Sequence, residues 1–174
     1  MLEFEFSSHG AGMIHAYRWE PEGQPRGVVQ IIHGIAEYVP RYAGFAAFLN
    51  ARGFLVTGED HMGHGGSVGE SETKGYFHGG WFTAVADTYR LLETTHQAYP
   101  EVPYVLFGHS MGSFMTRTIL EKYPDSGISA CVICGRPSMR RCANWPMRSS
   151  AKAPSSGTIS ATPCSREVPI SMAA

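Results

Sequence analysis

The sequence predicts an α/β fold, with a mostly parallel sheet and helices on both faces. Two apolar, β-branched runs, residues 27–34 ("GVVQIIHG") and 54–60 ("FLVTGED"), are typical of strands that are buried on both faces. Segments with helical apolar spacing alternate with the strand-like runs along the chain. This alternation requires crossover connections between parallel strands, which are right-handed in nearly all proteins.

Each element has its own signal. Residues 2–8 alternate apolar and charged side chains and predict a half-exposed strand, with residues 12–21 as its antiparallel partner. Gly53 closes a predicted amphipathic helix over 41–53, and a glycine-rich loop follows the second buried strand. The later predicted elements are a helix over 80–100 that stops at Pro100, a strand over 104–108, a helix over 112–124 and a strand over 128–134.

The composition changes at Gly135. Residues 135–174 contain no Leu, Phe, Tyr, His or Asp, and Ser, Ala, Pro and Arg make up most of them. Such a segment buries too little apolar area to offset the entropy of ordering it. We therefore expect residues 1–134 to form the N-terminal part of one domain, truncated after about the sixth strand. Residues 135–174 form an atypical tail, either disordered or, as we favour, the product of a shifted reading frame.

Composition excludes several classes of partner. The net charge of −1 gives no clustered basic surface for nucleic acid. No apolar run reaches the roughly 20 residues of a membrane span, and the acidic start "MLEFEFSSHG" does not resemble a signal peptide. We expect a cytoplasmic protein without a transmembrane segment.

The cysteine pair Cys131 and Cys134 has the C-x-x-C spacing, but it lies inside a strand-like run. A redox pair needs a helix start beside it to lower the thiol pKa. We therefore expect buried structural thiols rather than a redox pair or a zinc site.

Ser110 is the candidate catalytic nucleophile. It is the central residue of Gly108-His109-Ser110-Met111-Gly112, a G-x-S-x-G motif between a predicted strand and a predicted helix. This context is what a nucleophile elbow requires, because small flanking residues permit the strained turn that exposes the serine hydroxyl.

Acyl transfer also needs two backbone N–H groups directed at the developing oxyanion. In this architecture one comes from the residue after the nucleophile, and the other from a loop after an earlier strand, here His33-Gly34-Ile35. We expect His33 to bind backbone atoms rather than to act as a general base.

A group of residues that could ligate a metal, Asp60, His61 and His64, follows the second buried strand, but it lies in a glycine-rich loop. A zinc site needs ligands on fixed elements with supporting hydrogen bonds. A turn organised by Asp60 is the simpler expectation, and we predict no metal and no cofactor.

Together, "HGIAEYVPRYAGFAAFLNARGF", "DHMGHGGS", "KGYF" and "GHSMGS" resemble the α/β-hydrolase superfamily, and within it the monoacylglycerol lipase and lysophospholipase group. The resemblance covers about residues 3 to 134. It implies hydrolysis of a small lipid-like ester through an acyl-serine intermediate. It also implies Ser110 as nucleophile, with the N–H groups of Ile35 and Met111 as the oxyanion hole.

The family's catalytic triad follows the order Ser, Asp, His. No histidine follows Ser110 in this sequence, and the only later acids are Glu121, Asp125 and Glu167. Since loss of the base costs on the order of a millionfold in turnover, we expect this chain to be inactive as given. The alternatives are a proline iminopeptidase-like enzyme and a non-catalytic fragment that binds an acyl ligand or a partner. Residues 128–134 would form an exposed sheet edge through which the chain could self-associate.

Overall fold

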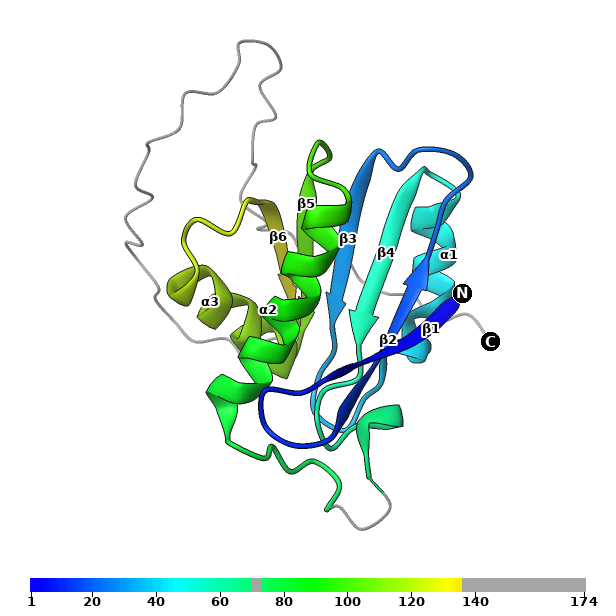
Figure 1. Ribbon diagram of the computed structural model, residues 1–174. Coiled ribbons are helices and arrows are strands. Elements are labelled where there is room, and N and C mark those ends of the chain that lie inside the picture. The colour runs from blue at the N-terminus through cyan, green and yellow to red at the C-terminus, as the bar shows by residue number, and fades with distance from the viewer. Residues whose placement is uncertain (70–72, 136–174) are drawn as a thin grey trace. The chain divides into compact units, whose positions relative to one another are not determined.

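A computed structural model of the chain describes residues 1–69 and 73–135, which form one six-stranded sheet with helices on both faces (Figure 1). The strand order is β1-β2-β4-β3-β5-β6. The strands are β1 Leu2–Ser7, β2 Met13–Trp19, β3 Gly27–Ile32, β4 Phe54–Glu59, β5 Tyr104–His109 and β6 Ile128–Cys134. The helices are α1 Ala43–Asn50, α2 Trp81–Ala98 and α3 Met111–Lys122, with short 3-10 turns η1 Val39–Tyr42 and η2 Gly65–Ser67.

Strand directions agree with the sequence-based prediction. β1 and β2 form an antiparallel pair, β2 pairs antiparallel with β4, and all other neighbours are parallel. The parallel strands therefore end at one edge of the sheet, and the segments that follow β3, β4 and β5 meet there. This edge is where open α/β sheets bind ligands.

Two separate apolar cores show which helix covers which face. On one face, α2 and α3 pack on β3, β4 and β5; on the other, α1 and η1 pack on β2, β3 and β4. The first core includes Val28, Leu55, Leu92, Leu106, Met115 and Ile119, and the second includes Trp19, Ile31, Val39, Ala46 and Val56. Every residue of β3 is buried, because β3 is central in the sheet and covered on both sides.

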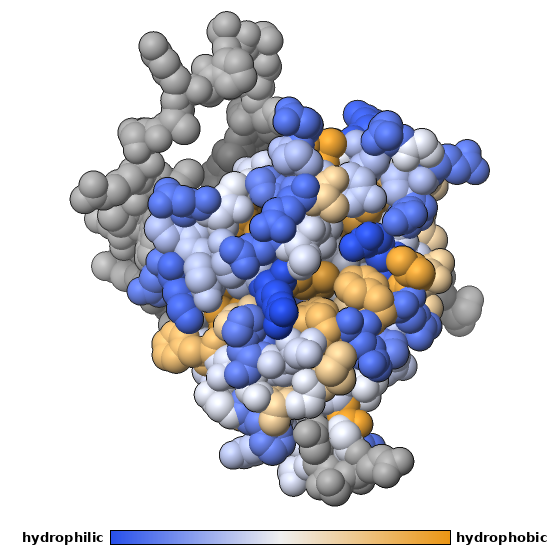
Figure 2. Space-filling view, in the orientation of Figure 1, coloured by the Kyte–Doolittle hydropathy of each residue, from blue (hydrophilic) through white to orange (hydrophobic). Residues whose placement is uncertain are grey.

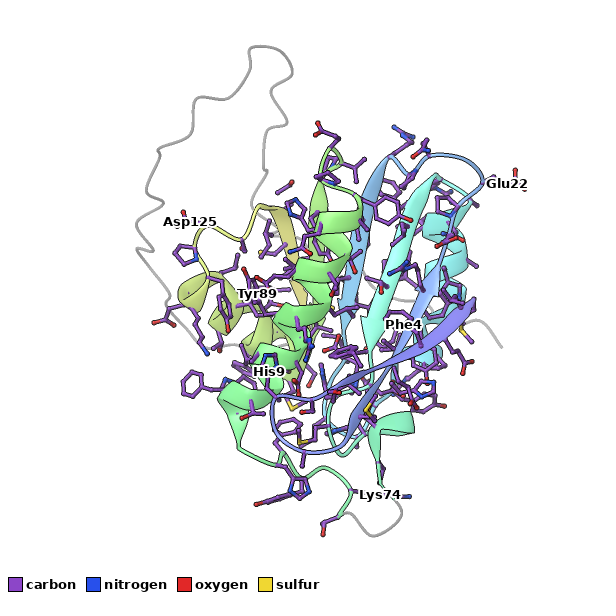
Figure 3. The ribbon with its side chains drawn as sticks, viewed as in Figure 1. Phe4, His9, Glu22, Lys74, Tyr89 and Asp125 are labelled. Carbon is purple, nitrogen blue, oxygen red and sulfur yellow. The ribbon has the colours of Figure 1, made fainter. Side chains whose placement is uncertain are left out.

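Two contacts fix the position of α2. At its middle, the ring of Tyr89, which is labelled in Figure 3, stacks on that of Tyr123 just after α3, with 3.6 Å between the centroids. The buried carboxylate of Asp87 accepts hydrogen bonds from the Ser8 hydroxyl at 2.6 Å and from the His9 backbone N–H at 2.7 Å. The loop between β1 and β2 is thereby tied to the helix.

The cysteine prediction was wrong. Cys131 is exposed and Cys134 is only partly buried. Both lie on β6, which is an edge strand of the described sheet and is mostly exposed along its middle. The prediction assumed that this strand is covered on both faces, as β3 is.

Two further findings concern the surface. Among the described helices, none combines the length and the apolar character that crossing a membrane would require. Figure 2 shows hydrophobic residues at the surface in small groups between hydrophilic ones. Scattered apolar residues of this kind are normal and do not by themselves mark an interaction site. The predicted tail lies outside the described residues except for Gly135.

Asp60, directly after β4, organises the loop that follows it. Its Oδ1 accepts the Val39 backbone N–H at 2.6 Å, and its Oδ2 accepts the Gly66 N–H at 2.8 Å and the Tyr17 hydroxyl at 3.1 Å. One buried carboxylate thus connects β2, η1 and η2.

Replacing Asp60 with Asn should lower the free energy of unfolding by about 2 to 3 kcal/mol, because an amide N–H₂ would face donors that now have a carboxylate acceptor. Urea denaturation followed by circular dichroism measures this. Asp125→Asn, at an exposed position after α3, is the matched control and should change stability by less than about 0.5 kcal/mol. Equal effects of the two substitutions would contradict the role given to Asp60.

We also predict that β6 supports self-association, since its outer edge has no partner strand among the described residues. The side chain of Val132 is 47 % exposed on this strand. Val132→Lys should reduce the oligomer fraction in sedimentation velocity, because a lysine on an edge strand opposes pairing. Phe48→Lys removes an apolar residue of similar exposure on α1 and should leave that fraction unchanged. An unmodified chain that is monomeric at high concentration would overturn this prediction.

Candidate active site

Ser110 lies in the tight turn between β5 and α3. Its backbone has φ 51° and ψ −116°, a left-handed conformation that non-glycine residues rarely adopt. Neighbouring groups hold this turn: the Ser110 N–H donates to the Cys134 carbonyl at 2.9 Å, and the Ser113 hydroxyl donates to the Ser110 carbonyl at 2.6 Å. The structure therefore has the strand-turn-helix geometry that the motif predicted.

Close packing explains why small residues surround Ser110. A Cβ on Gly112 would collide with the Ile32 carbonyl group, so α3 can start here only with glycine. A Cβ on Gly34 would lie 3.0 Å from the Cβ of Ser110. The loop after β3 is therefore in direct contact with the serine turn, as the oxyanion arrangement requires.

The two N–H groups predicted for the oxyanion hole are those of Ile35 and Met111. Met111 is the first residue of α3, so its N–H has no acceptor within the helix. Neither N–H bonds to any group in the part of the chain that the structure describes. The structure brings the loop at residue 34 and the Ser110 turn together, and the catalytic roles remain predictions.

Glu37 connects the loop to the serine turn. Its Oε2 accepts three hydrogen bonds: from the Gly34 N–H at 2.8 Å, from the Tyr42 hydroxyl at 2.7 Å and from His109 Nδ1 at 3.0 Å. Its Oε1 accepts Arg41 at 2.9 Å. The side chain of His109, next to Ser110, is thus held toward Glu37.

These donors keep Glu37 ionised. Burial alone would raise its pKa, but the hydrogen bonds from Tyr42, Gly34 and His109 outweigh burial and lower the pKa to about 2. Sequence reasoning missed this residue. The signal was "HGIAEY" itself, an acid three positions after a loop glycine, but its partners lie on other elements.

His33, His61 and His64 form a buried cluster beside the loop. The rings of His33 and His61 stack with 3.9 Å between centroids. His33 Nδ1 bonds to the Gly34 carbonyl at 2.7 Å, as expected for a histidine that binds backbone atoms. His64 Nδ1 bonds to the Met62 carbonyl, and its Nε2 is buried without a partner among the described residues. The candidate metal ligands do not converge, because Asp60 bonds to backbone N–H groups and a tyrosine.

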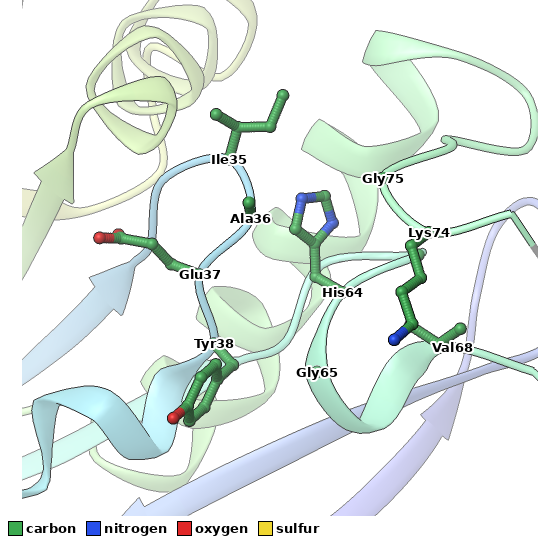
Figure 4. Close-up of a pocket in the computed structure, with 10 residues that line it drawn as sticks. Ile35, Ala36, Glu37, Tyr38, His64, Gly65, Val68, Lys74 and Gly75 are labelled. Atoms are coloured by element: carbon green, nitrogen blue, oxygen red, sulfur yellow. The ribbon is translucent and has the colours of Figure 1, made fainter.

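A cavity of about 540 Å³ lies beside the loop after β3, between that loop and the segment after β4. Figure 4 shows residues 35–38 along one wall and His64, Val68 and Lys74 along the other. The volume lies within the range of small-molecule pockets. The cavity adjoins Ile35, whose side chain is 63 % exposed.

Residues 23–159 match the family model described as serine aminopeptidase, S33 (Hydrolase_4). The chain belongs to this family. The match extends past Cys134, where we expected the resemblance to stop. The assignment of residues 135–174 to a separate tail stays a prediction.

Curated relatives of the chain include lipases. A monoglyceride lipase of Mus musculus is 34 % identical over 106 residues, which is 61 % of this chain and 34 % of the relative. A monoacylglycerol lipase of Mycolicibacterium smegmatis is 34 % identical over 134 residues, covering 76 % of this chain and 46 % of the relative. The chain thus spans less than half the length of these relatives.

Solved structures support the same family. The thermostable carboxyl esterase of Bacillus coagulans superimposes with a TM-score of 0.67 at 31 % identity, covering 77 % of this chain and 44 % of that one. The predicted α/β-hydrolase fold is confirmed, and the chain is by family a hydrolase.

The ionised Glu37 should make stability depend on pH. Its folded pKa lies below the usual value of 4.5, so its contribution is present above that value and is lost as the pH falls toward 2. From pH 5 to pH 3, the unmodified chain should lose up to about 2 kcal/mol more unfolding free energy than Glu37→Gln. Urea denaturation at both pH values measures the difference. Glu22→Gln, at an exposed position, should behave like the unmodified chain, and identical pH dependence in all three would contradict the assignment.

Proposed function

We propose that the chain represents a serine hydrolase of carboxylic esters, of the monoacylglycerol lipase or lysophospholipase type, that acts through an acyl-serine intermediate. In this proposal the Ser110 hydroxyl attacks the ester carbonyl, and the N–H groups of Ile35 and Met111 bind the oxyanion. No cofactor is needed for this chemistry.

The observation that carries the proposal is the contact between the Ser110 turn and the loop after β3. Ser110 has the strained backbone of a nucleophile elbow. The close approach at Gly34 brings a second loop to it, and the next N–H along that loop has no partner in the described residues. A purely structural turn would need neither the strained backbone nor this unused donor.

The nature of the substrate is supported by the site and by the relatives' names. The cavity beside Ile35 is large enough for a small ester or a short lipid; it shares Ile35 with the proposed oxyanion hole, and Ser110 and Met111 are not among its lining residues. The relatives named above are described as acting on monoglycerides and monoacylglycerols. A lipid-like ester of this kind is the substrate class that we propose.

The base of the proposed mechanism is not identified in this chain. All eight histidines of the sequence lie before Ser110. Both ring nitrogens of His33 and of His61 already have hydrogen-bond partners within the buried cluster, and His109 bonds to Glu37. We therefore propose that this chain turns over substrate poorly, and that it retains the part of the site that accepts an acyl group.

A peptidase function is the second candidate, and the description of the family model, serine aminopeptidase, favours it. A proline iminopeptidase-like enzyme would use the same serine and oxyanion donors on an amide bond. A third possibility, binding of acyl ligands or a partner without chemistry, is favoured by the absence of a histidine after Ser110.

The unmodified chain should become acylated on Ser110 by a 4-nitrophenyl ester when imidazole is added as an external base, with steady turnover below about 1 s⁻¹. The reason is that the oxyanion donors assist attack while no internal base completes the cycle. Intact-protein and peptide mass spectrometry measures the acyl adduct.

Ser110→Ala should abolish the adduct, and Ser7→Ala, at an exposed serine of β1, should not. Prolyl 4-nitroanilide in place of the ester tests the peptidase alternative. Absence of any Ser110 adduct with either substrate would favour the binding fragment, and rapid turnover without imidazole would reveal an internal base.

A further inference from the structure

The loop after β3 contains two successive peptide units, and three of their four polar groups are held. The Gly34 N–H donates to Glu37, and the His33 carbonyl accepts His61 Nε2 at 3.2 Å. The Gly34 carbonyl accepts His33 Nδ1 at 2.7 Å and, at the longer distance of 3.3 Å, the Glu37 N–H. The fourth group is the Ile35 N–H. In a trans peptide the C=O and N–H point in opposite directions, so the bonds at the Gly34 carbonyl, of which that from His33 is the shorter, determine the direction of the Ile35 N–H.

The protonation of His33 follows from its partners. Its Nε2 receives the backbone N–H of His61 at 3.0 Å, and a backbone N–H can only donate. Its Nδ1 therefore carries the proton that binds the Gly34 carbonyl. Burial lowers the pKa of His33 well below its usual value, so the ring is neutral.

The same logic applies to His61. Burial lowers the pKa of His61 to about 4, so its ring is neutral and carries one proton; Nε2 bonds to a carbonyl and holds that proton, and Nδ1 therefore has a lone pair. That lone pair faces Glu59 Oε1 at 3.2 Å. Two acceptors cannot bond to each other, and a donor is required between them. With His61 neutral, the proton at this contact is that of a neutral Glu59 carboxyl group.

The environment of Glu59 agrees with a neutral carboxyl group. Glu59 is fully buried, and burial raises its pKa to about 8. The Thr88 hydroxyl donates to Oε1 at 2.6 Å, and Gln30, held by the Tyr104 hydroxyl at 2.7 Å, reaches Oε2 at 3.5 Å. Burial also lowers the pKa of His61 to about 4. The other titratable groups that face this pair are Asp87 of α2, Asp60 and His64 of the loop after β4, Tyr104 of β5 and His33.

We propose that Glu59 and His61 are positioning residues for the oxyanion hole: the neutral carboxyl group of Glu59 fixes the tautomer of His61, which holds the His33 carbonyl and, through His33, the Ile35 N–H. The inference rests on the proposed function only where it concerns catalysis. Ionisation of Glu59 would draw the His61 proton to Nδ1 and free the His33 carbonyl, since an unprotonated Nε2 cannot donate to it.

The test needs no variant in its first arm. Nitrogen-15 NMR of the unmodified chain should show His33 protonated at Nδ1 and His61 at Nε2 at pH 6.5. The His61 resonances should then change to the Nδ1-protonated pattern with a midpoint near pH 8. A His61 that is protonated at Nδ1 at pH 6.5, or whose tautomer is constant up to pH 9.5, would overturn the proposal.

Two variants form the second arm. Glu59→Gln supplies an amide N–H₂ donor that cannot titrate, so His61 should stay protonated at Nε2 throughout. Glu59→Leu removes the titrating group, so the change of the His61 tautomer near pH 8 should disappear in this variant as well. If Glu59→Leu does not fold, the titration of the unmodified chain and of Glu59→Gln still decides the question.

The third arm measures imidazole-supported acylation of Ser110. Glu59→Leu should acylate about tenfold more slowly than the unmodified chain, because a small displacement of an oxyanion donor weakens transition-state binding. Glu59→Gln should restore the rate. If the unmodified chain is not acylated at all, the proposed function is wrong, and the NMR titration still tests the Glu59–His61 contact independently. If acylation occurs and Glu59→Leu acylates at the unmodified rate, the positioning role is wrong and the proposed function survives.

Discussion

The carboxylate of Glu37 is the interaction on which the arrangement at the carboxyl edge of the sheet depends. It binds the Gly34 N–H, the Tyr42 hydroxyl, His109 and Arg41. These partners belong to the loop after β3, the end of η1 and the end of β5, where the ring of Tyr42 also makes edge contacts with the rings of Phe107 and His109. A charged acceptor makes stronger hydrogen bonds than a neutral one. The strained backbone of Ser110 therefore lies between two segments that the same carboxylate holds.

A second carboxyl group, Glu59, lies on the other side of the loop in the opposite state. Burial raises the pKa of both residues, and the number of donors decides the outcome. Glu37 has four donors and its pKa is lowered to about 2, whereas Glu59 is fully buried, with Thr88 as its one close donor, and its pKa is raised to about 8. One acid therefore accepts hydrogen bonds at neutral pH, and the other is able to donate one. Carboxyl groups with such different protonation states are common in active sites, where environment assigns the role.

The sequence predicted the elements well and the polar contacts poorly, for physical reasons. Apolar periodicity reports burial directly, so each strand and helix of the described residues was found near its predicted position. The serine turn was predictable because backbone strain requires glycine at fixed offsets, which a local pattern records. By contrast, His109 and Glu37 are 72 positions apart and His61 and His33 are 28 apart. No local pattern encodes such a pairing, and "GED" reads as the end of a strand whether or not Glu59 is neutral. The cysteines of β6 were misjudged because burial of an edge strand depends on what lies beside it.

In this fold the groups that would bind the oxyanion and the group that would act as general base can come from different parts of the chain. On the proposed assignment, the oxyanion donors come from the loop after β3 and the start of α3, and the groups that orient the loop lie in the loop itself, in β4 and the segment after it, in η1 and at the end of β5. They require only a correct tautomer and a fixed peptide plane. A general base requires a titratable group within hydrogen-bond reach of the Ser110 hydroxyl. Among the histidines near this site, His33 and His61 bond to each other and to backbone groups, and His109 bonds to Glu37. Oxyanion stabilisation and substrate binding alone still accelerate acyl transfer by roughly 10³ to 10⁴ over water when a triad is removed. A site of this composition would therefore accept an acyl group from an activated ester far more readily than it would release one.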